Sequence, residues 1–110
     1  MNVILRSTCG LLDDAVESAT SLLKAMANKH RLMVLIKLVD REYSVKELER
    51  VTGLGQSALS QHLARLRRDG LVTTRKSAQT VFYRLSDRKT RKLLETLDNL
   101  FEQEFETPLS

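Results

Sequence analysis

Short hydrogen-bonding and cationic side chains share one face of a helix that the sequence predicts over residues 56–69. Leu59, Leu63 and Leu66 repeat at helical spacing and form an apolar stripe. Glutamine can contact adenine, arginine can contact guanine or phosphate, and serine can contact either. The face is therefore a candidate for reading the edges of base pairs. Opposite the stripe lie Ser57, Gln61, Ala64 and Arg68, flanked by Ser60 and Arg65.

The elements around this helix favour base reading over the plain alternative, which is that any soluble helix has a polar outer face. A short helix over 45–52 begins after Ser44, which can form a capping box with Glu47. Gly53 and Gly55 permit a tight turn into the second helix. A helix, a turn and a second helix in this order place the second helix in the DNA major groove.

A β-hairpin is predicted directly after the second helix, over residues 71–85. Gly70 is expected to end the helix, and strands are expected at 71–75 and 79–85 because β-forming residues fill the second of them. The expected tip presents Arg75, Lys76 and Gln79, which could reach phosphates or the minor groove. The alternative is a solvated hairpin without a ligand.

The distribution of charge favours a polyanionic partner. The 110 residues carry a net charge of +4, yet residues 61–92 hold ten Lys or Arg against two Asp or Glu. Few aromatic residues are available for stacking on single-stranded RNA, so duplex DNA is the better candidate. No apolar stretch approaches the roughly 20 residues of a membrane span, and residues 1–12 do not resemble a signal peptide. We therefore expect a cytoplasmic protein with no membrane partner.

The remaining helices complete one domain, residues 1–110, with a mainly α fold and a small β-hairpin. A first helix is predicted over 11–27, a buried central helix over 29–39 and a last helix over 87–104, capped by Ser86. Residues 1–10 are expected to be mobile.

The first and last helices are too apolar for one small domain to cover, so we predict a homodimer that pairs them across a two-fold axis. Such a dimer would place two recognition helices about 34 Å apart, matching a palindromic operator. The alternative is that the last helix packs only on its own domain. The expected interface residues are Leu12, Val16, Leu23, Leu94, Leu97 and Phe101.

The segments LLKAMANKHRLMVLIKL, SVKELERVTGLGQSALSQHLARLRRDGLV and TTRKSAQTVFYRL resemble the ArsR/SmtB family of dimeric winged helix-turn-helix regulators. The resemblance runs from about residue 22 to 85, and is strongest to the non-metal branch that includes HlyU-, NolR- and BigR-like proteins. It implies a DNA-binding transcription regulator, expected to be a repressor, whose last helix and first helix form the dimer. It also implies the DNA contacts Gln56, Ser57, Ser60, Gln61 and Arg65, with Arg75, Lys76 and Gln79 from the wing.

The chain departs from the effector sites that the resemblance implies. Metal-sensing members have a Cys-x-Cys site where this chain reads Ser44-Val45-Lys46-Glu47, and no histidine follows Asp87 in the last helix. Dithiol sensors have cysteines where Ile36 and Glu102 stand. We therefore expect no metal and no cofactor.

Cys9 is the single cysteine of the chain, and it leaves two interpretations open. One is a tolerated free thiol in a reducing compartment. The other is a redox-responsive regulator in which Cys9 pairs with its copy in a dimer or is modified.

Two function classes other than DNA binding are weaker. Ser60 and His62 point about 160° apart on their helix and cannot form a catalytic relay, so we expect no enzyme activity. A winged-helix module that binds proteins without specific DNA binding is disfavoured by Arg65, Arg68 and the basic hairpin.

Overall fold

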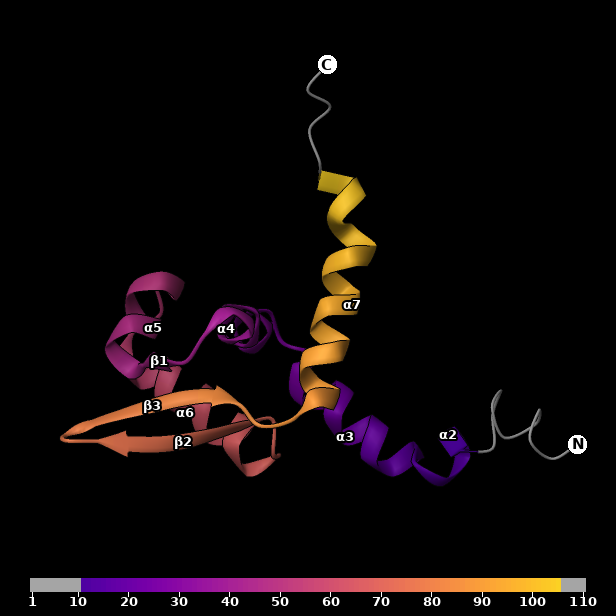
Figure 1. Cartoon of the computed structure of the whole chain (residues 1–110), viewed down its shortest axis with the longest axis horizontal. Coiled ribbons are helices and arrows are strands. Elements are labelled where there is room, and N and C mark those ends of the chain that lie inside the picture. Colours follow the sequence, from indigo (N-terminus) through magenta and orange to yellow (C-terminus); the bar gives the residue numbers. More distant parts are fainter. Residues whose placement is uncertain (1–10, 106–110) are drawn as a thin grey trace, which may run out of the picture.

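The computed structural model of this chain describes residues 11–105, and side chains from residue 13 to residue 102. Its architecture is mainly helical, with one small antiparallel sheet in the order β1-β3-β2 (Figure 1). The predicted fold class is confirmed. The helices are α2 (Leu11–Asp14), α3 (Val16–Met26), α4 (Lys29–Asp40), α5 (Val45–Thr52), α6 (Gln56–Arg68) and α7 (Arg88–Phe105). The strands are β1 (Tyr43–Ser44), β2 (Val72–Ser77) and β3 (Thr80–Leu85).

The first helix is interrupted, whereas the sequence predicted one helix over 11–27. Ala15 separates α2 from α3 with φ −107° and ψ 11°, in the bridge region outside the α basin. The amide N–H of Ala19 then donates to the Ala15 carbonyl at 2.8 Å, and the helical ladder resumes. Apolar spacing shows which face of a helix is buried, but it does not report the dihedral angles of a single residue.

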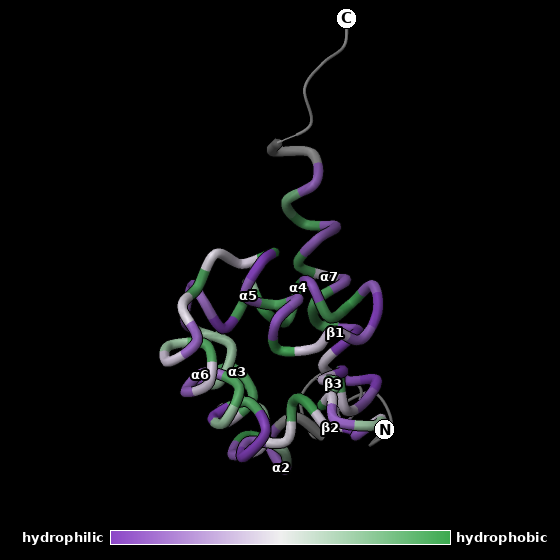
Figure 2. Tube along the Cα trace, turned by 90° about the vertical axis from the view of Figure 1, so that its left-hand side faces the viewer, coloured by the Kyte–Doolittle hydropathy of each residue, from purple (hydrophilic) through white to green (hydrophobic). Residues whose placement is uncertain are grey.

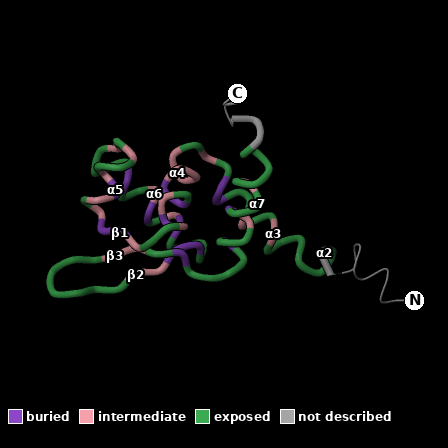
Figure 3. Tube along the Cα trace, turned by 45° about the horizontal axis from the view of Figure 1, so that its top comes forward, coloured by how far each residue is buried: buried purple, intermediate pink, exposed green. Residues whose placement is uncertain are grey.

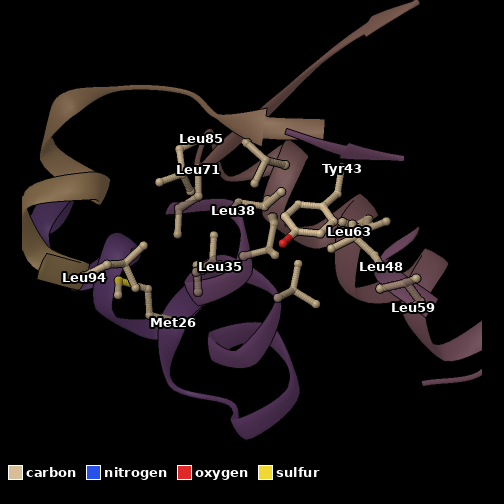
Figure 4. Close-up of a cluster of buried hydrophobic side chains, with 14 residues drawn as sticks. Met26, Leu35, Leu38, Tyr43, Leu48, Leu59, Leu63, Leu71, Leu85 and Leu94 are labelled. Atoms are coloured by element: carbon tan, nitrogen blue, oxygen red, sulfur yellow. The ribbon is translucent and has the colours of Figure 1, made fainter. Parts of the chain in front are cut away.

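The central helix α4 supplies the middle of the core. Asn28 caps it, because the Asn28 side-chain oxygen accepts from the amides of His30 and Arg31 at 3.0 Å each. Val34, Leu35 and Leu38 of α4 are at most 1% exposed. Figure 4 shows Leu35 and Leu38 surrounded by buried side chains from the other elements. Helices α3, α5, α6 and α7 and strand β3 all pack against this helix.

Helix α5 spans the predicted residues 45–52, and α6 begins at the predicted Gln56 but ends at Arg68, one residue before the predicted end. The Ser44 hydroxyl accepts from the Glu47 amide at 3.2 Å, and the Glu47 carboxylate accepts from the Ser44 amide at 2.9 Å. Gly53 ends α5 with φ 74°, and Gly70 follows α6 with φ 82°, values that suit glycine. The capping box and both glycine positions are confirmed.

The hairpin has longer strands than expected and a third strand beside it. Ser77 pairs with Thr80, so the turn consists of Ala78 and Gln79 alone, and residues 76 and 77 belong to β2. Ala78 has φ 55°, which an alanine rarely adopts. Turns of this kind usually contain glycine or asparagine, and because neither stands here, the sequence carried no marker for the turn. Strand β1 pairs with β3, and its two residues are too few to form a recognisable strand pattern in the sequence.

The last helix begins at Arg88 and projects from the body of the protein (Figure 1). Asp87 caps it by accepting from the Thr90 amide at 3.0 Å, while the Ser86 hydroxyl, the expected cap, donates to the Gly70 carbonyl. The radius of gyration is 16.6 Å, against about 13 Å for a compact domain of about 100 residues. The chain therefore has arms that its own core does not cover.

These arms are α3 and the outer half of α7. Figure 3 shows both largely exposed, and Figure 2 shows apolar residues recurring along the projecting half of α7. Within residues 11–105, no helix combines the length and apolar character needed to cross a bilayer.

Candidate nucleic-acid interface

The polar face of α6 points into solvent. Its apolar stripe, Leu59, Leu63 and Leu66, is at most 2% exposed, and it fixes the rotation of the helix against the core. Because one side of α6 is held so completely, the opposite side is presented in a defined direction. The residues exposed on α6 include Gln56, Ser57, Ser60, Gln61, Ala64 and Arg68.

Two arginines converge at the C-terminal end of α6. Arg65 Nε donates to Asp69 at 3.2 Å, and Arg68 Nε donates to the other oxygen of that carboxylate at 3.4 Å. Burial alone would raise the pKa of the Asp69 carboxyl, but the hydrogen bonds from Arg65 and Arg68 outweigh burial and hold this pKa below its usual value. Asp69 thus orients both guanidinium groups, and Arg65 lies half-buried.

The sequence led us to expect that Arg75 extends freely from the hairpin, but in the structure it is bound to Glu42. Its Nε donates to the two oxygens of Glu42 at 2.8 and 3.0 Å, and its guanidinium carbon lies 4.7 Å from the centre of the Phe82 ring. The hydrogen bond from Arg75 is the main cause that lowers the pKa of Glu42. Pairing of β1 with β3 places Glu42 there, so the contact depends on a strand that the sequence did not reveal.

Lys76 and Gln79 remain exposed at the end of the hairpin. Figure 3 shows the whole tip exposed, well away from the core. The hairpin therefore offers one cationic and one amide side chain that reach beyond the body of the protein, as a wing requires.

A cleft of about 480 Å³ is lined by α6, by Val45 of α5 and by Tyr83 of β3. Ser60 and Arg67 lie seven residues apart on one edge of α6, and Tyr83 of β3 faces them across the cleft. Arg67 and Tyr83 were not among the predicted site residues. The helical wheel could have suggested Arg67, but only the tertiary arrangement of α6 and the sheet brings Tyr83 to the same cleft.

The predicted dimer residues fall into different environments. Val16 and Leu23 share one face of α3 and are 49% and 55% exposed, and Phe101 is 48% exposed. Leu97 is half-buried. Leu94 is only 3% exposed and belongs to the core of its own chain beside Met26 (Figure 4), so its assignment to an interface was wrong. The side chain of Leu12 lies outside the described residues.

Metal-binding and redox groups are sparse in the part of the chain that the structure describes. No three His, Cys, Asp or Glu side chains between residues 13 and 102 lie close enough to hold a metal ion. His62 is half-buried with its ring centre 5.8 Å from that of His30, and burial, with Arg31 and His30, lowers the pKa of His62. Cys9 lies outside the described residues.

Comparison with known proteins identifies relatives of this arrangement. A sequence model described as "Bacterial regulatory protein, arsR family" matches residues 28–74, which include α4, the helix-turn-helix and the start of β2. The transcriptional activator HlyU of Vibrio cholerae is 59% identical over 85 residues, which cover 77% of this chain and 79% of HlyU. The nodulation protein NolR of Rhizobium meliloti is 46% identical over 85 residues, covering 77% of this chain and 70% of NolR.

Solved structures show the same fold. The reduced form of HlyU from Vibrio cholerae superposes with a TM-score of 0.78 at 54% identity, over 82% of this chain and 95% of the HlyU chain. The transcriptional repressor BigR from Xylella fastidiosa superposes with a TM-score of 0.78 at 39% identity, over 82% of this chain and 92% of the BigR chain.

Proposed function

This chain belongs to the arsR family of bacterial regulatory proteins, and we propose that it regulates transcription by binding a palindromic operator in double-stranded DNA as a homodimer. The observation that carries the proposal is the exposed serine and glutamine face of α6, held in place by a fully buried leucine stripe. A helix presented in this way fits the major groove of B-DNA.

The residues divide by chemistry into base readers and phosphate contacts. We assign base reading to Gln56, Ser57, Ser60 and Gln61, because their short side chains can form hydrogen bonds to base edges. Phosphate contacts fall to the cationic and wing residues, since ion pairs with phosphate position a protein without reading sequence. These are Arg65, Arg67, Arg68, Lys76 and Gln79. In the free protein Arg75 is hydrogen-bonded to Glu42, so it contacts phosphate only after it leaves that carboxylate.

The uncovered faces of α3 and α7 support the homodimer. Val16 and Leu23 on α3 and Leu100 on α7 are each about half exposed or more, and Leu100 is 66% exposed. Burying three such side chains and their copies removes apolar surface that a monomer would leave in water. A second chain would therefore cover the apolar faces of α3 and α7 that the 95 described residues leave exposed, and the dimer would set the spacing of the two α6 helices.

The direction of regulation follows from where such a dimer lies. The relatives include one named an activator, HlyU, and one named a repressor, BigR. A dimer of this size on a promoter blocks polymerase by occupancy, so we assign repression; displacement of another DNA-bound protein would turn the same binding into activation. We assign the chain to the cytoplasm, where bacterial DNA lies, and assign it no enzymatic activity and no metal or cofactor.

The experiment is a binding titration on operator and on random duplex DNA over a range of salt. Affinity for both should fall steeply as salt rises, because phosphate contacts release counterions. Gln61→Ala should cost about 1–3 kcal/mol on the operator and little on random DNA, whereas Lys76→Ala should weaken both alike. Equal losses on both DNAs for both variants would refute base reading by Gln61. If the protein binds neither DNA at any salt concentration, a protein-binding module would be favoured instead.

A further inference from the structure

Both histidines of the chain lie at one flank of α6. His62 of α6 and His30 in the first turn of α4 are half-buried, and their ring centres are 5.8 Å apart. Neither ring takes part in the hydrogen bonds or ion pairs found between residues 13 and 102. No fully enclosed side-chain nitrogen in that range lacks a partner, so the ring nitrogens of both histidines reach solvent. The pair can therefore donate hydrogen bonds to a ligand at the surface.

The two flanks of α6 face different parts of the protein. Ser60 and Arg67 lie on the flank that borders the cleft with Tyr83 of the sheet. Arg65 and His62, three residues apart, lie on the other flank, because about 100° separates successive residues of a helix. The major groove is about 12 Å wide, so a helix that enters it has a phosphate strand on each side. The flank with His62 therefore faces the strand that the sheet side of α6 leaves uncontacted.

Arg31 gives this flank a fixed positive charge. Its Nε donates to the Ala25 carbonyl at 2.6 Å and its Nη2 donates to the Lys24 carbonyl at 3.2 Å, so the guanidinium group is held at the end of α3. Burial is the main cause that lowers the pKa of His62, and Arg31 and His30 lower it further. Protonation of His62 is therefore opposed in the free protein.

Within residues 13–102, no carboxylate acts on His62. The charged and titratable groups that do act on it are Arg31 and His30 of α4. Asp69 attracts Arg31, but both oxygens of this carboxylate already accept hydrogen bonds from arginines of α6, and Arg65 adds positive charge beside Arg31. A protonated His62 therefore lacks a compensating anion in the free protein. A DNA phosphate on this flank would supply that anion and favour the protonated ring.

We propose that His30 and His62 bind a backbone phosphate beside the major groove and take up a proton from solvent as they do so. This inference rests on the DNA binding proposed above, and it adds a phosphate contact on the side of α6 away from the sheet. A phosphate beside the pair raises the pKa of His62 from its lowered value, so affinity for DNA should rise as pH falls. Phosphates carry no sequence information, so operator and random duplex DNA should gain alike.

Fluorescence anisotropy on both DNAs at pH 7.5 and pH 6.0, at constant ionic strength, measures the effect. If phosphate raises the pKa of His62 by about one, each chain gains up to about tenfold in affinity, and a dimer has two such pairs. Because only part of each titration falls between these two pH values, the wild type should bind both DNAs about tenfold more tightly at pH 6.0. Few other groups titrate in this range, since the chain has only two histidines.

Three variants assign the proton. His62→Gln should lower affinity about tenfold more at pH 6.0 than at pH 7.5, and the double variant His30→Gln with His62→Gln should bind equally at both. Gln61→Ala is the control from the base-reading face of α6. It should lose affinity for the operator and keep the full pH dependence.

Titration of the imidazole signals by NMR tests the same point directly. Two histidines give two sets of signals in a chain labelled with ¹⁵N, and single variants assign them. Random duplex DNA should raise the pKa of His62 by about one. An unchanged pKa in the complex would reject the phosphate contact.

Each contrary result overturns a defined claim. Binding that is independent of pH in the wild type would reject proton uptake and leave the proposed function intact. A pH dependence that survives in the double variant would place the proton elsewhere, and one confined to the operator would reject a phosphate contact. An equal loss at both pH values for His62→Gln would show that the ring only packs. If the wild type binds neither DNA at any pH, the proposed function fails and this inference fails with it. Circular dichroism at each pH confirms that every variant is folded.

Discussion

Replacing Glu42 by glutamine should release an arginine onto DNA. In the free protein Glu42 accepts two hydrogen bonds from Arg75 Nε, at 2.8 and 3.0 Å, while the guanidinium group lies over Phe82. A neutral amide cannot hold the guanidinium group with the same charge-assisted bonds. We therefore expect Glu42→Gln to bind random duplex DNA more tightly and to be less selective for the operator.

The size of the effect follows from counterion release. Each new phosphate contact steepens the slope of log K against log salt by about 0.9, and a dimer carries two wings, so the slope should steepen by about 1.8. Between 50 and 200 mM salt, a fourfold range, the affinity of Glu42→Gln should then fall about twelvefold further than that of the wild type. Fluorescence anisotropy on labelled random duplex DNA measures both slopes.

Two variants separate this effect from a change in net charge. Glu17→Gln removes the same charge from α3, at the opposite end of the molecule from the wing (Figure 1), and should leave the slope unchanged. Adding Arg75→Gln to Glu42→Gln should restore the wild-type slope. If Glu42→Gln and Glu17→Gln give the same slope, Arg75 is not held back by Glu42 and the reasoning is wrong.

Three further predictions concern the dimer, the helix-turn-helix and pH. Leu23→Glu should raise the dimer dissociation constant about tenfold or more in sedimentation, because it buries a charge among apolar side chains. Tenfold corresponds to a loss of ~1.4 kcal/mol of dimerisation free energy. The control variant Leu23→Met should dimerise normally. Ser44→Ala should lower the free energy of unfolding by about 1 kcal/mol in urea, with an unchanged slope, since α5 loses its cap; no loss would show that the capping box is not stabilising. Because the folded pKa of His62 lies below its ordinary value, its contribution to stability should be present above about pH 6.5 and be lost as pH falls below that, and His62→Gln should flatten this dependence. The carboxyls with lowered pKa act near pH 4 and below, so a titration of stability from pH 7.5 to 5.5 isolates His62.

Local sequence patterns predicted the parts of the fold that neighbouring residues determine. The Ser44–Glu47 capping box joins residues three positions apart, and the Leu59, Leu63 and Leu66 stripe repeats over about two turns of one helix. Each depends on helix geometry alone, so the spacing of residue types is enough to find it. The same reasoning gave the outward face of α6.

Contacts between distant residues could not be predicted in this way. Glu42 and Arg75 are 33 residues apart and meet only because β1 pairs with β3. Leu94 has the spacing of an exposed interface residue, yet it packs in the core, because the crossing of α7 over the body decides which apolar line faces inward. A sequence pattern shows that a face is apolar, but it does not show which neighbour covers it.

Selection of bound sequences from a random duplex library tests the central claim most directly. If a homodimer presents two α6 helices to one side of the DNA, the wild-type chain should enrich an inverted repeat whose half-site centres lie about 10 base pairs apart. Gln61→Ala should enrich the same repeat with relaxed preference at one position of each half. Enrichment of single, unpaired sites, or of no sequence at all, would contradict the account.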